Sequence, residues 1–538
     1  MNGIMKTIHI LPTLLLASCC FADAQAQKPD TIWVSFSNRF IQNEPIRIAI
    51  IDSIEFQENK AVLYQRLGTT GRTLALSRVY RDGTYSFEKP GRTLVVPSLY
   101  ASNDYTWSGA RWSLERCQES EHFALFWDKT MSKNDKGLLT ATYSTYRSNA
   151  NQILEYAEKA WSFYADSLGF LVTGKSISDK FKTQLYIVDQ NDWRADASGT
   201  DGTYYRYTAN TETSAVATAG KTGIAHWNPW AASDMVTRSH EIGHTFQYLV
   251  SADLGDTHGM NYVLGENSSG NEWWEDCANW MAHKLHPTQQ FTSNWGNNMN
   301  MHHMNILHED ARYNNCYYHD WWCQLHGMTT IGRIWRESIR PEDPVQAYMR
   351  LFGLNEETFA DEMWLGYAHM ACMDIDCWKK YSSRYFNQEK QRLKTPSARQ
   401  KEFIGESTTG WLMVDSAYCV QNYGYNANPL TVPTVGTTVT VHFKGLAGAP
   451  GFRSVYTQRA GWRYGLVAYS SDGTYTYGEM QSAAEGSATL TVPAKCANIW
   501  LVVMGAPTTY WTHPWNGSVA DDEQWPYAVR IEGTTIKQ

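Results

Sequence analysis

The sequence predicts a multidomain α+β protein, and three observations support this prediction. The chain has 538 residues, more than one ordinary hydrophobic core accommodates. Its first and last parts consist of short strand-like runs separated by Gly, Asn and Asp, whereas its middle part carries apolar residues at helical spacing. Hydrophobic residues make up 43% and charged residues 19%, a balance typical of globular rather than disordered chains.

The first residues predict export. Lys6 precedes a largely apolar stretch, Ile8 to Ala17, which has the length of a signal-peptide core and is too short to span a bilayer. Two endings remain open, because Leu16-Ala17-Ser18-Cys19 has the form of a lipobox, whereas Ala24-Gln25-Ala26 offers ordinary cleavage after Ala26. We therefore expect a signal peptide over residues 1–26 and a secreted, periplasmic or cell-surface protein. A lipid on Cys19 would be its only membrane contact.

Three regions follow the signal peptide. Residues 27–113 contain short strand-like runs such as Thr31–Phe36 and Arg92–Pro97, which predict an N-terminal β-domain. Residues 411–538 return to strand-like runs, such as Thr438–Phe443 and Ile499–Val503, and predict a C-terminal β-sandwich. The formal net charge is −8 and no long basic run occurs, so we expect no nucleic-acid partner.

Residues 114–410 are expected to form the domain that carries the chemistry. A strand is predicted at Glu121–Trp127, and apolar residues from Ile153 to Leu168 recur at three- and four-residue steps, which predicts an amphipathic helix. Strands are predicted again at Lys182–Val188 and Gly223–Trp227. Helical spacing begins at Met235 and dominates to about residue 400.

One motif in this region predicts a metal centre. His240-Glu241-Ile242-Gly243-His244 contains two histidines four residues apart, which share one face of a helix and can direct both imidazoles to one ion. Glu241 lies about 100° around the helix from His240, where it can take a proton from a water at the ion instead of binding the ion itself. Zinc is the expected cofactor, because it lowers the pKa of a bound water toward ~7.

The third ligand must come from another part of the chain. Glu275 stands at the start of a second predicted helix, and the small Ala278 one turn later would let the two helices approach. Glu272 and Glu266 are rivals, but they precede that helix. Five further histidines fit no ligand spacing and are interpreted mostly as surface or core residues: His302, His303, His308, His319 and His326.

His-Glu-x-x-His followed some tens of residues later by a helical Glu resembles the gluzincin metallopeptidases, which include thermolysin-like, aminopeptidase-type and enhancin-like families. The resemblance implies His240, His244 and Glu275 as zinc ligands and Glu241 as the general base. It also implies an edge strand that pairs with extended substrate, for which the candidates are Gly223, Ile224, Ala225, His226 and Trp227. Tyr313 is our first choice for stabilising the oxyanion, ahead of Tyr317, Tyr318 and His319.

The wider chain is similar to an exported bacterial domain family of unknown function. The similar segments are Ser120–Phe123, Ile224–Trp230 and Gln524–Tyr527, and they span most of residues 110–538. This similarity indicates a shared architecture and no substrate.

The sequence leaves more than one function open. The leading hypothesis is an exported zinc metallopeptidase with a gluzincin-like catalytic domain, acting on peptides or glycoproteins. The alternative is a surface protein that binds glycans or glycoproteins with a degenerate peptidase scaffold and the aromatic-rich C-terminal domain. A glycosidase ranks third, since no pair of carboxylates has distinguishable roles. Glu241 favours the enzyme, because a binding scaffold needs no base beside its metal.

Overall fold

The computed structural model describes most of the chain from Asp30 onward, together with Thr7 and Ile8. Apart from Ile8, the predicted signal-peptide core, Cys19 and Ala26 lie outside the described residues. The described ranges are 7–8, 30–36, 44–57, 60–67, 74–81, 83–86, 91–97, 100–142, 144–189, 209–213, 221–254, 271–291, 293–382, 392–394 and 410–537.

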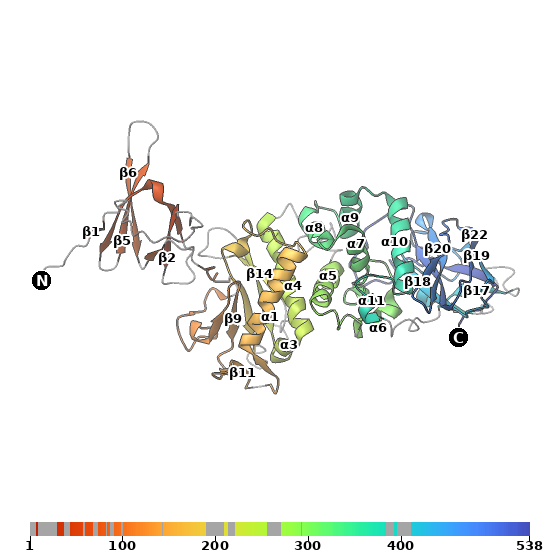
Figure 1. Ribbon diagram of the computed structural model, residues 1–538, viewed down its shortest axis with the longest axis horizontal. Coiled ribbons are helices and arrows are strands. Elements are labelled where there is room, and N and C mark those ends of the chain that lie inside the picture. The colour runs from red at the N-terminus through yellow and green to blue at the C-terminus, as the bar shows by residue number, and fades with distance from the viewer. Residues whose placement is uncertain are drawn as a thin grey trace, which may run out of the picture.

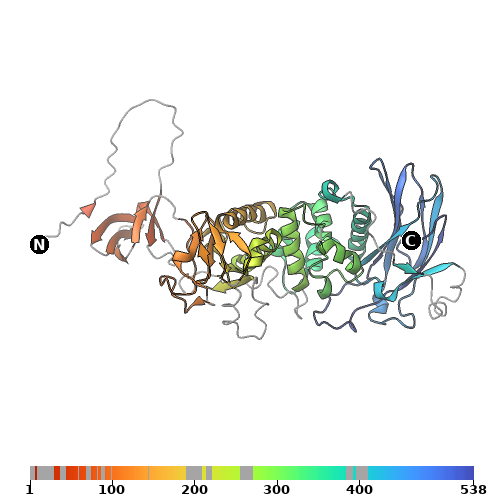
Figure 2. The ribbon, with the colours of Figure 1, turned by 90° about the horizontal axis from the view of Figure 1, so that it is seen from below.

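The molecule is a row of β, α and β regions (Figures 1 and 2). Two small sheets come first, with strand orders β1-β4-β5-β6 and β3-β2-β7. The predicted strand Thr31–Phe36 is β2. The bounds are β1 Thr7–Ile8, β2 Thr31–Phe36, β3 Glu44–Arg47, β4 Ile51–Gln57, β5 Lys60–Leu67, β6 Leu74–Arg81 and β7 Gly83–Ser86.

The segment before Ser113 differs from the prediction. Arg92–Pro97 forms no strand, and only Thr93 makes an isolated bridge, to Phe181. Tyr100 and Trp112, assigned by sequence to the N-terminal β-domain, pack instead in a cluster on the central sheet. The physical reason is burial of large aromatic rings, which no local pattern reveals.

A five-stranded sheet, in the order β14-β15-β13-β9-β8, underlies the central region. Strand β13 is parallel to both neighbours, whereas β14 and β8 are antiparallel to theirs. Its bounds are β8 Cys117–Glu119, β9 Phe123–Trp127, β13 Thr183–Ile187, β14 Ala209–Thr213 and β15 Lys221–Trp227. A separate small sheet contains β10 Ser132–Lys133, β11 Leu138–Thr140 and β12 Arg147–Asn149.

Helices cover this sheet and continue toward the C-terminal region (Figure 1). The predicted amphipathic helix is α1, whose apolar side is buried against the sheet, and the helix predicted from Met235 is α4. The bounds are α1 Ala150–Ser162, α3 Pro229–Ser233, α4 Met235–Leu254, α5 Asn271–Leu285, α6 Ser293–Met301, α7 Tyr318–His326, α8 Thr330–Glu337, α9 Pro344–Phe352, α10 Glu356–Ala371 and α11 Lys379–Ser382. None of the described helices combines the length and apolar character needed to cross a membrane.

Two facing sheets form the C-terminal region, in the orders β16-β17-β24-β19-β22 and β18-β23-β20-β21. Inward residues such as Val441, Leu466 and Val529 form a core between them, while Trp364 of α10 donates its indole N–H to the carbonyl of Val502. The bounds are β16 Leu393–Lys394, β17 Trp411–Val414, β18 Tyr425–Leu430, β19 Thr438–Gly445, β20 Trp462–Ser470, β21 Tyr475–Tyr477, β22 Glu485–Thr491, β23 Cys496–Gly505 and β24 Tyr527–Glu532. The mixed α+β class is therefore confirmed.

Candidate metal centre

Helix α4 carries the two predicted histidine ligands. The Asp234 carboxylate accepts the backbone N–H of Thr237 at 2.8 Å and caps the start of the helix. Ile242, with other apolar residues of the helix, is buried in the central core. His240 and His244 are one turn apart and share a face, because an α-helix has 3.6 residues per turn.

Helix α5 approaches α4 closely and brings the third side chain. A Cβ added at Gly243 would lie only 3.5 Å from the Cα of Ala278 and 3.3 Å from the Sδ of Met281, so the helices meet at small residues. The expected role of Ala278 in this approach agrees with this geometry. Glu275, three residues earlier on α5, then reaches both imidazoles.

Two nitrogens and one oxygen converge on one point. The Oε2 of Glu275 lies 3.0 Å from the Nε2 of His240 and 3.1 Å from the Nε2 of His244, and the two nitrogens are 2.9 Å apart. Ligand atoms about 2.0–2.2 Å from a tetrahedral zinc ion are separated by about 3.3–3.6 Å, slightly more than is observed here. The three atoms therefore match three neighbouring corners of such a site.

The neighbours of His240 determine which of its nitrogens carries hydrogen. The side-chain amide of Asn279 donates through Nδ2 to the carbonyl of Tyr313 at 2.7 Å, which identifies its other atom as the oxygen. That Oδ1 lies 2.7 Å from the Nδ1 of His240 and must accept from it. Neutral His240 consequently presents a lone pair at Nε2, toward Glu275.

Gln247 acts in the same way on His244. Its Nε2 donates to the carbonyl of Trp274 at 2.9 Å, so its Oε1, 2.9 Å from the Nδ1 of His244, accepts the imidazole N–H. His244 therefore also presents a lone pair at Nε2. Gln247 and Asn279 were not predicted from the sequence. Gln247 follows His244 by three residues and Asn279 follows Glu275 by four, and both spacings place side chains on one helical face.

Three lone pairs directed at one another repel unless a cation lies between them. The pKa shifts of Glu275 and His244 have the directions expected for a site that attracts a cation. Burial opposes ionisation of Glu275, but the two imidazoles outweigh it and hold the carboxyl pKa well below its usual range. Burial also lowers the pKa of His244, but the Glu275 charge outweighs it and raises this pKa to about 9. The site thus attracts one positive charge, which a proton or a metal ion can supply.

Glu241 is buried on α4 between the two histidines. Burial raises its pKa well above the usual range; His244 opposes this shift and Glu275 adds to it. A carboxylate whose proton affinity is raised in this way is a better proton acceptor than an exposed one.

Tyr313 lies at the centre, and the other three oxyanion candidates do not. Its hydroxyl donates to the Oε1 of Glu275 at 3.0 Å, and 41% of the residue is exposed. Tyr317 and Tyr318 are buried in the helical core, and His319 directs its Nδ1 to the carbonyl of Cys316. Tyr313 is therefore the candidate whose hydroxyl contacts a predicted ligand.

A segment of the C-terminal region reaches the edge of the centre. The guanidinium carbon of Arg312 lies 5.1 Å from the ring centroid of Tyr313 and 5.5 Å from that of Trp515. The backbone N–H of Gly517 donates to the Oε1 of Glu309 at 2.7 Å. Residues before β24 thus contribute to the surroundings of Tyr313.

The predicted substrate strand requires correction. β15 pairs with β13 on one side and with β14 on the other, so it is an interior strand without a free edge for a peptide. Its members Gly223, Ile224, Ala225, His226 and Trp227 are all buried. A Cβ at Gly223 would lie 2.6 Å from the Cβ of Thr245 on α4, so this glycine permits strand and helix to touch. β14 is the outer strand on this side among the described residues.

Glu266 and Glu272 were the rival third ligands in the sequence. Glu266 lies outside the described residues, and Glu272 lies within α5 but its side chain is not described. Glu275 holds the position predicted for it.

A second cluster of two histidines and one carboxylate lies between the helical and C-terminal regions. The Asp522 carboxylate is 3.3 Å from the Nε2 of His308 and 3.2 Å from the Nε2 of His513. The Nδ1 of His513 lies 3.3 Å from the Oε2 of Glu309. Sequence spacing did not reveal this cluster, because His308 and its partners are far apart in the chain.

The two clusters contain the same types of side chain, but they differ in which imidazole nitrogen carries the hydrogen. His308 accepts the backbone N–H of Asp310 at its Nδ1, at 3.1 Å, so neutral His308 carries its hydrogen on Nε2 and directs it to Asp522. Hydrogen bonds and charge attraction between the Asp522 carboxylate and the imidazoles of His308 and His513 account for the arrangement of the second cluster. His240, His244 and Glu275 instead offer two imidazole nitrogens and a carboxylate oxygen as free ligands, a set that suits zinc and other first-row metals.

These features define a class: a multidomain α+β protein with a candidate metal centre of two histidines and one glutamate. The chain belongs to the DUF6055 family, a family of unknown function whose model matches residues 87–538. No curated protein matches the chain. No activity is assigned to this family, so the function is inferred from the site.

Proposed function

We propose that this protein is an exported zinc-dependent hydrolase of the gluzincin type, and that it cleaves peptide bonds in peptides or glycoproteins. One observation carries the proposal: the Nε2 lone pairs of His240 and His244 and the Oε2 of Glu275 converge within 3.1 Å of one another. The Nδ1–H groups of His240 and His244 donate to the side-chain oxygens of Asn279 and Gln247, and these hydrogen bonds maintain that arrangement. Export is inferred from the apolar stretch Ile8 to Ala17.

The residues around the centre have distinct roles in this proposal. A bound zinc ion would supply the positive charge that acidifies water and polarises the scissile carbonyl. Glu241 would accept the proton of the attacking water and pass it to the leaving amine. The Tyr313 hydroxyl, now donating to Glu275, would turn to donate to the oxyanion. The outer strand β14 replaces β15 as the candidate for pairing with an extended peptide.

Glu241→Gln tests the proposal because it removes the base and leaves all three ligands intact. Hydrolysis of a peptide and glycopeptide library should fall by at least about 10²–10⁴-fold, while zinc content and thermal stability stay at the wild-type level. Glu158→Gln is a matched control, since Glu158 also lies beside a histidine, His122, but far along the chain from the motif. It should cleave like the wild type.

Two results would contradict this function. Equal cleavage by wild type and Glu241→Gln would exclude Glu241 as the base. A zinc-loaded wild type that cleaves no library member but binds glycans or glycoproteins would support the alternative, a binding protein on a peptidase-like scaffold.

A further inference from the structure

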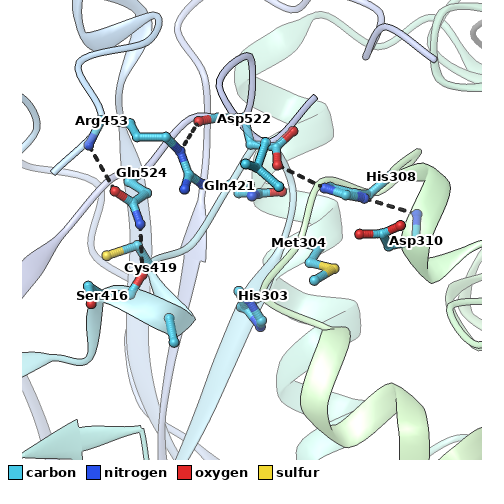
Figure 3. Close-up of a pocket in the computed structure, with 12 residues that line it drawn as sticks. His303, Met304, His308, Asp310, Ser416, Cys419, Gln421, Arg453, Asp522 and Gln524 are labelled. Atoms are coloured by element: carbon cyan, nitrogen blue, oxygen red, sulfur yellow. Dashed lines mark hydrogen bonds and ion pairs between the residues drawn. The ribbon is translucent and has the colours of Figure 1, made fainter. Parts of the chain in front are cut away.

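A separate cavity of about 150 Å³ lies between the helical region and the C-terminal sandwich (Figure 3). An apolar cavity of about this size holds a benzene-sized molecule, so the space suits a small ligand or one terminal group of a larger one. Its walls come from two parts of the chain, the turn before Tyr313 and the sandwich loops. The lining residues used below are His303, His308, Asp310, Gln421, Arg453 and Asp522.

Arg453 is held in place with part of its hydrogen-bonding capacity unused. Its Nε donates to the carbonyl of Asp522 at 2.8 Å, and its backbone N–H donates to the Oε1 of Gln524 at 2.8 Å. Gln524 in turn donates to the carbonyl of Ser416 at 2.8 Å. Among the described residues, the two terminal nitrogens of Arg453 have no hydrogen-bond partner. A guanidinium held at Nε keeps one free edge, formed by its two terminal nitrogens, and this edge is suited to bidentate recognition of a carboxylate.

Gln421 adds a donor beside this guanidinium. Its Oε1 accepts the backbone N–H of Asn305 at 2.6 Å, which orients the amide and leaves Nε2 without a hydrogen-bond partner among the described residues. Gln421 is 5% exposed, so the amide has little freedom to turn away. Arg453, Gln421 and His303 all line the cavity, and Figure 3 shows Gln421 next to Arg453 in this view, with His303 below them.

The acidic residues of the lining, Asp522 and Asp310, do not neutralise the positive charge of Arg453. The Asp522 carboxylate points toward His308 (Figure 3), and the imidazoles of His308 and His513 lie within 3.3 Å of its oxygens. Asp310 is exposed to solvent, which screens its charge, and Figure 3 shows it at the end of the view opposite Arg453. The buried carboxylate of the lining is therefore already paired, and the terminal nitrogens of Arg453 and the Nε2 of Gln421 remain available to a ligand.

We propose that this cavity is a binding site for a small organic carboxylate, with Arg453 gripping both carboxylate oxygens and Gln421 donating to one of them. The carboxylate can belong to an acidic sugar of a glycan or to an acidic group of a peptide. This site is independent of the metal centre and of peptide hydrolysis, because its residues include none of His240, Glu241, His244 and Glu275.

Titration calorimetry on the full protein with glucuronate and N-acetylglutamate tests the proposal, with methyl glucoside and inorganic sulfate as comparison ligands. Gln421→Glu keeps the acceptor for Asn305 but places a negative charge beside Arg453, so it should weaken carboxylate binding by at least about tenfold. Gln324→Glu is the matched control, because the Oε1 of Gln324 also accepts a backbone N–H, that of Asp376 at 2.8 Å, outside the cavity. It should bind like the wild type.

Each outcome decides a point. Binding of glucuronate alone assigns the site to acidic glycans, binding of N-acetylglutamate alone to peptides, and binding of both shows recognition of the carboxylate only. The proposal is overturned if the folded wild type binds neither, if methyl glucoside binds as well as glucuronate, if only sulfate binds, or if Gln421→Glu binds as tightly as Gln324→Glu. Thermal unfolding of each variant establishes that it is folded.

Discussion

The described part of the chain contains two clusters of two histidines and one carboxylate, and they differ in what lies behind the imidazoles. At His240 and His244, side-chain amide oxygens accept from Nδ1, so both Nε2 lone pairs face Glu275. At His308, a backbone N–H donates to Nδ1, so Nε2 carries hydrogen and faces Asp522. The same residue types thus form a candidate metal site in one place and a hydrogen-bonded ionic cluster in the other.

Whether a group of histidines and carboxylates can bind a metal ion depends on the hydrogen-bond partners of the histidines as much as on the residue types in the group. An imidazole binds a metal only through a nitrogen without hydrogen, and the partner of its other nitrogen decides which one that is. Counting histidines and carboxylates within reach of one another would treat both clusters as equal.

The largest expected effect separates the clusters by metal content. His244→Ala should abolish stoichiometric zinc binding and hydrolysis, because two ligands hold zinc poorly. His308→Ala removes a histidine of the second cluster and should leave one zinc ion per chain. Elemental analysis of the two purified, folded variants checks this. Loss of zinc from His308→Ala with retention in His244→Ala would reverse the assignment.

A smaller effect is expected from the residue behind His240. Asn279→Ala should weaken zinc binding by about 10–100-fold, because the imidazole loses the acceptor that fixes its tautomer. Asn294→Ala is the control, since its Nδ2 donates to the same carbonyl of Tyr313, at 2.7 Å. Competition with a zinc chelator measures both affinities. Equal weakening in the two variants would mean that the position of Tyr313, and not the tautomer of His240, is responsible.

A third effect concerns the second cluster and is a change in stability with pH. Burial lowers the pKa of His513, but Asp522 and the other nearby acids outweigh it and raise this pKa above its usual value. A raised folded pKa stabilises the protein fully below the ordinary value of about 6.5 and loses that effect as pH rises through the folded value. His513→Gln should therefore cost about 1.5–3 kcal/mol at pH 6 and clearly less at pH 9.

Chemical denaturation at both pH values measures this difference. The control is His442→Gln, because His442 forms a solvent-exposed pair with Glu532 and should cost about 1 kcal/mol or less. A cost for His513→Gln that is the same at pH 6 and pH 9 would show that packing, not charge, dominates at this position.

Local spacing in the sequence predicted more of the first cluster than of the second. The four-residue step places His240 and His244 on one face of α4, whereas Glu275 comes from α5 and was assigned from its place at the start of that helix and from the resemblance to the gluzincins. His308 meets His513 and Asp522 only because the sandwich packs on the helices, and no local pattern encodes that contact. The carboxylate cavity depends on the same packing.

The order of the strands in a sheet was the second feature that local sequence patterns did not predict. The apolar run Gly223–Trp227 correctly predicted a strand, but its order in the sheet depends on pairing with β14, for which no strand was predicted. Likewise Tyr100 and Trp112 follow strand-like residues in the chain but pack against the central sheet. Periodicity reports which face of an element is buried, whereas neighbours in a sheet are set by tertiary packing.

Anomalous diffraction at the zinc edge, from crystals of the zinc-loaded protein, shows which of the two clusters holds the ion. We expect one strong peak about 2.0–2.2 Å from the Nε2 atoms of His240 and His244 and from the Oε2 of Glu275. No peak should occur between His308, His513 and Asp522. A peak at the second cluster, or no peak at the first, would contradict the account.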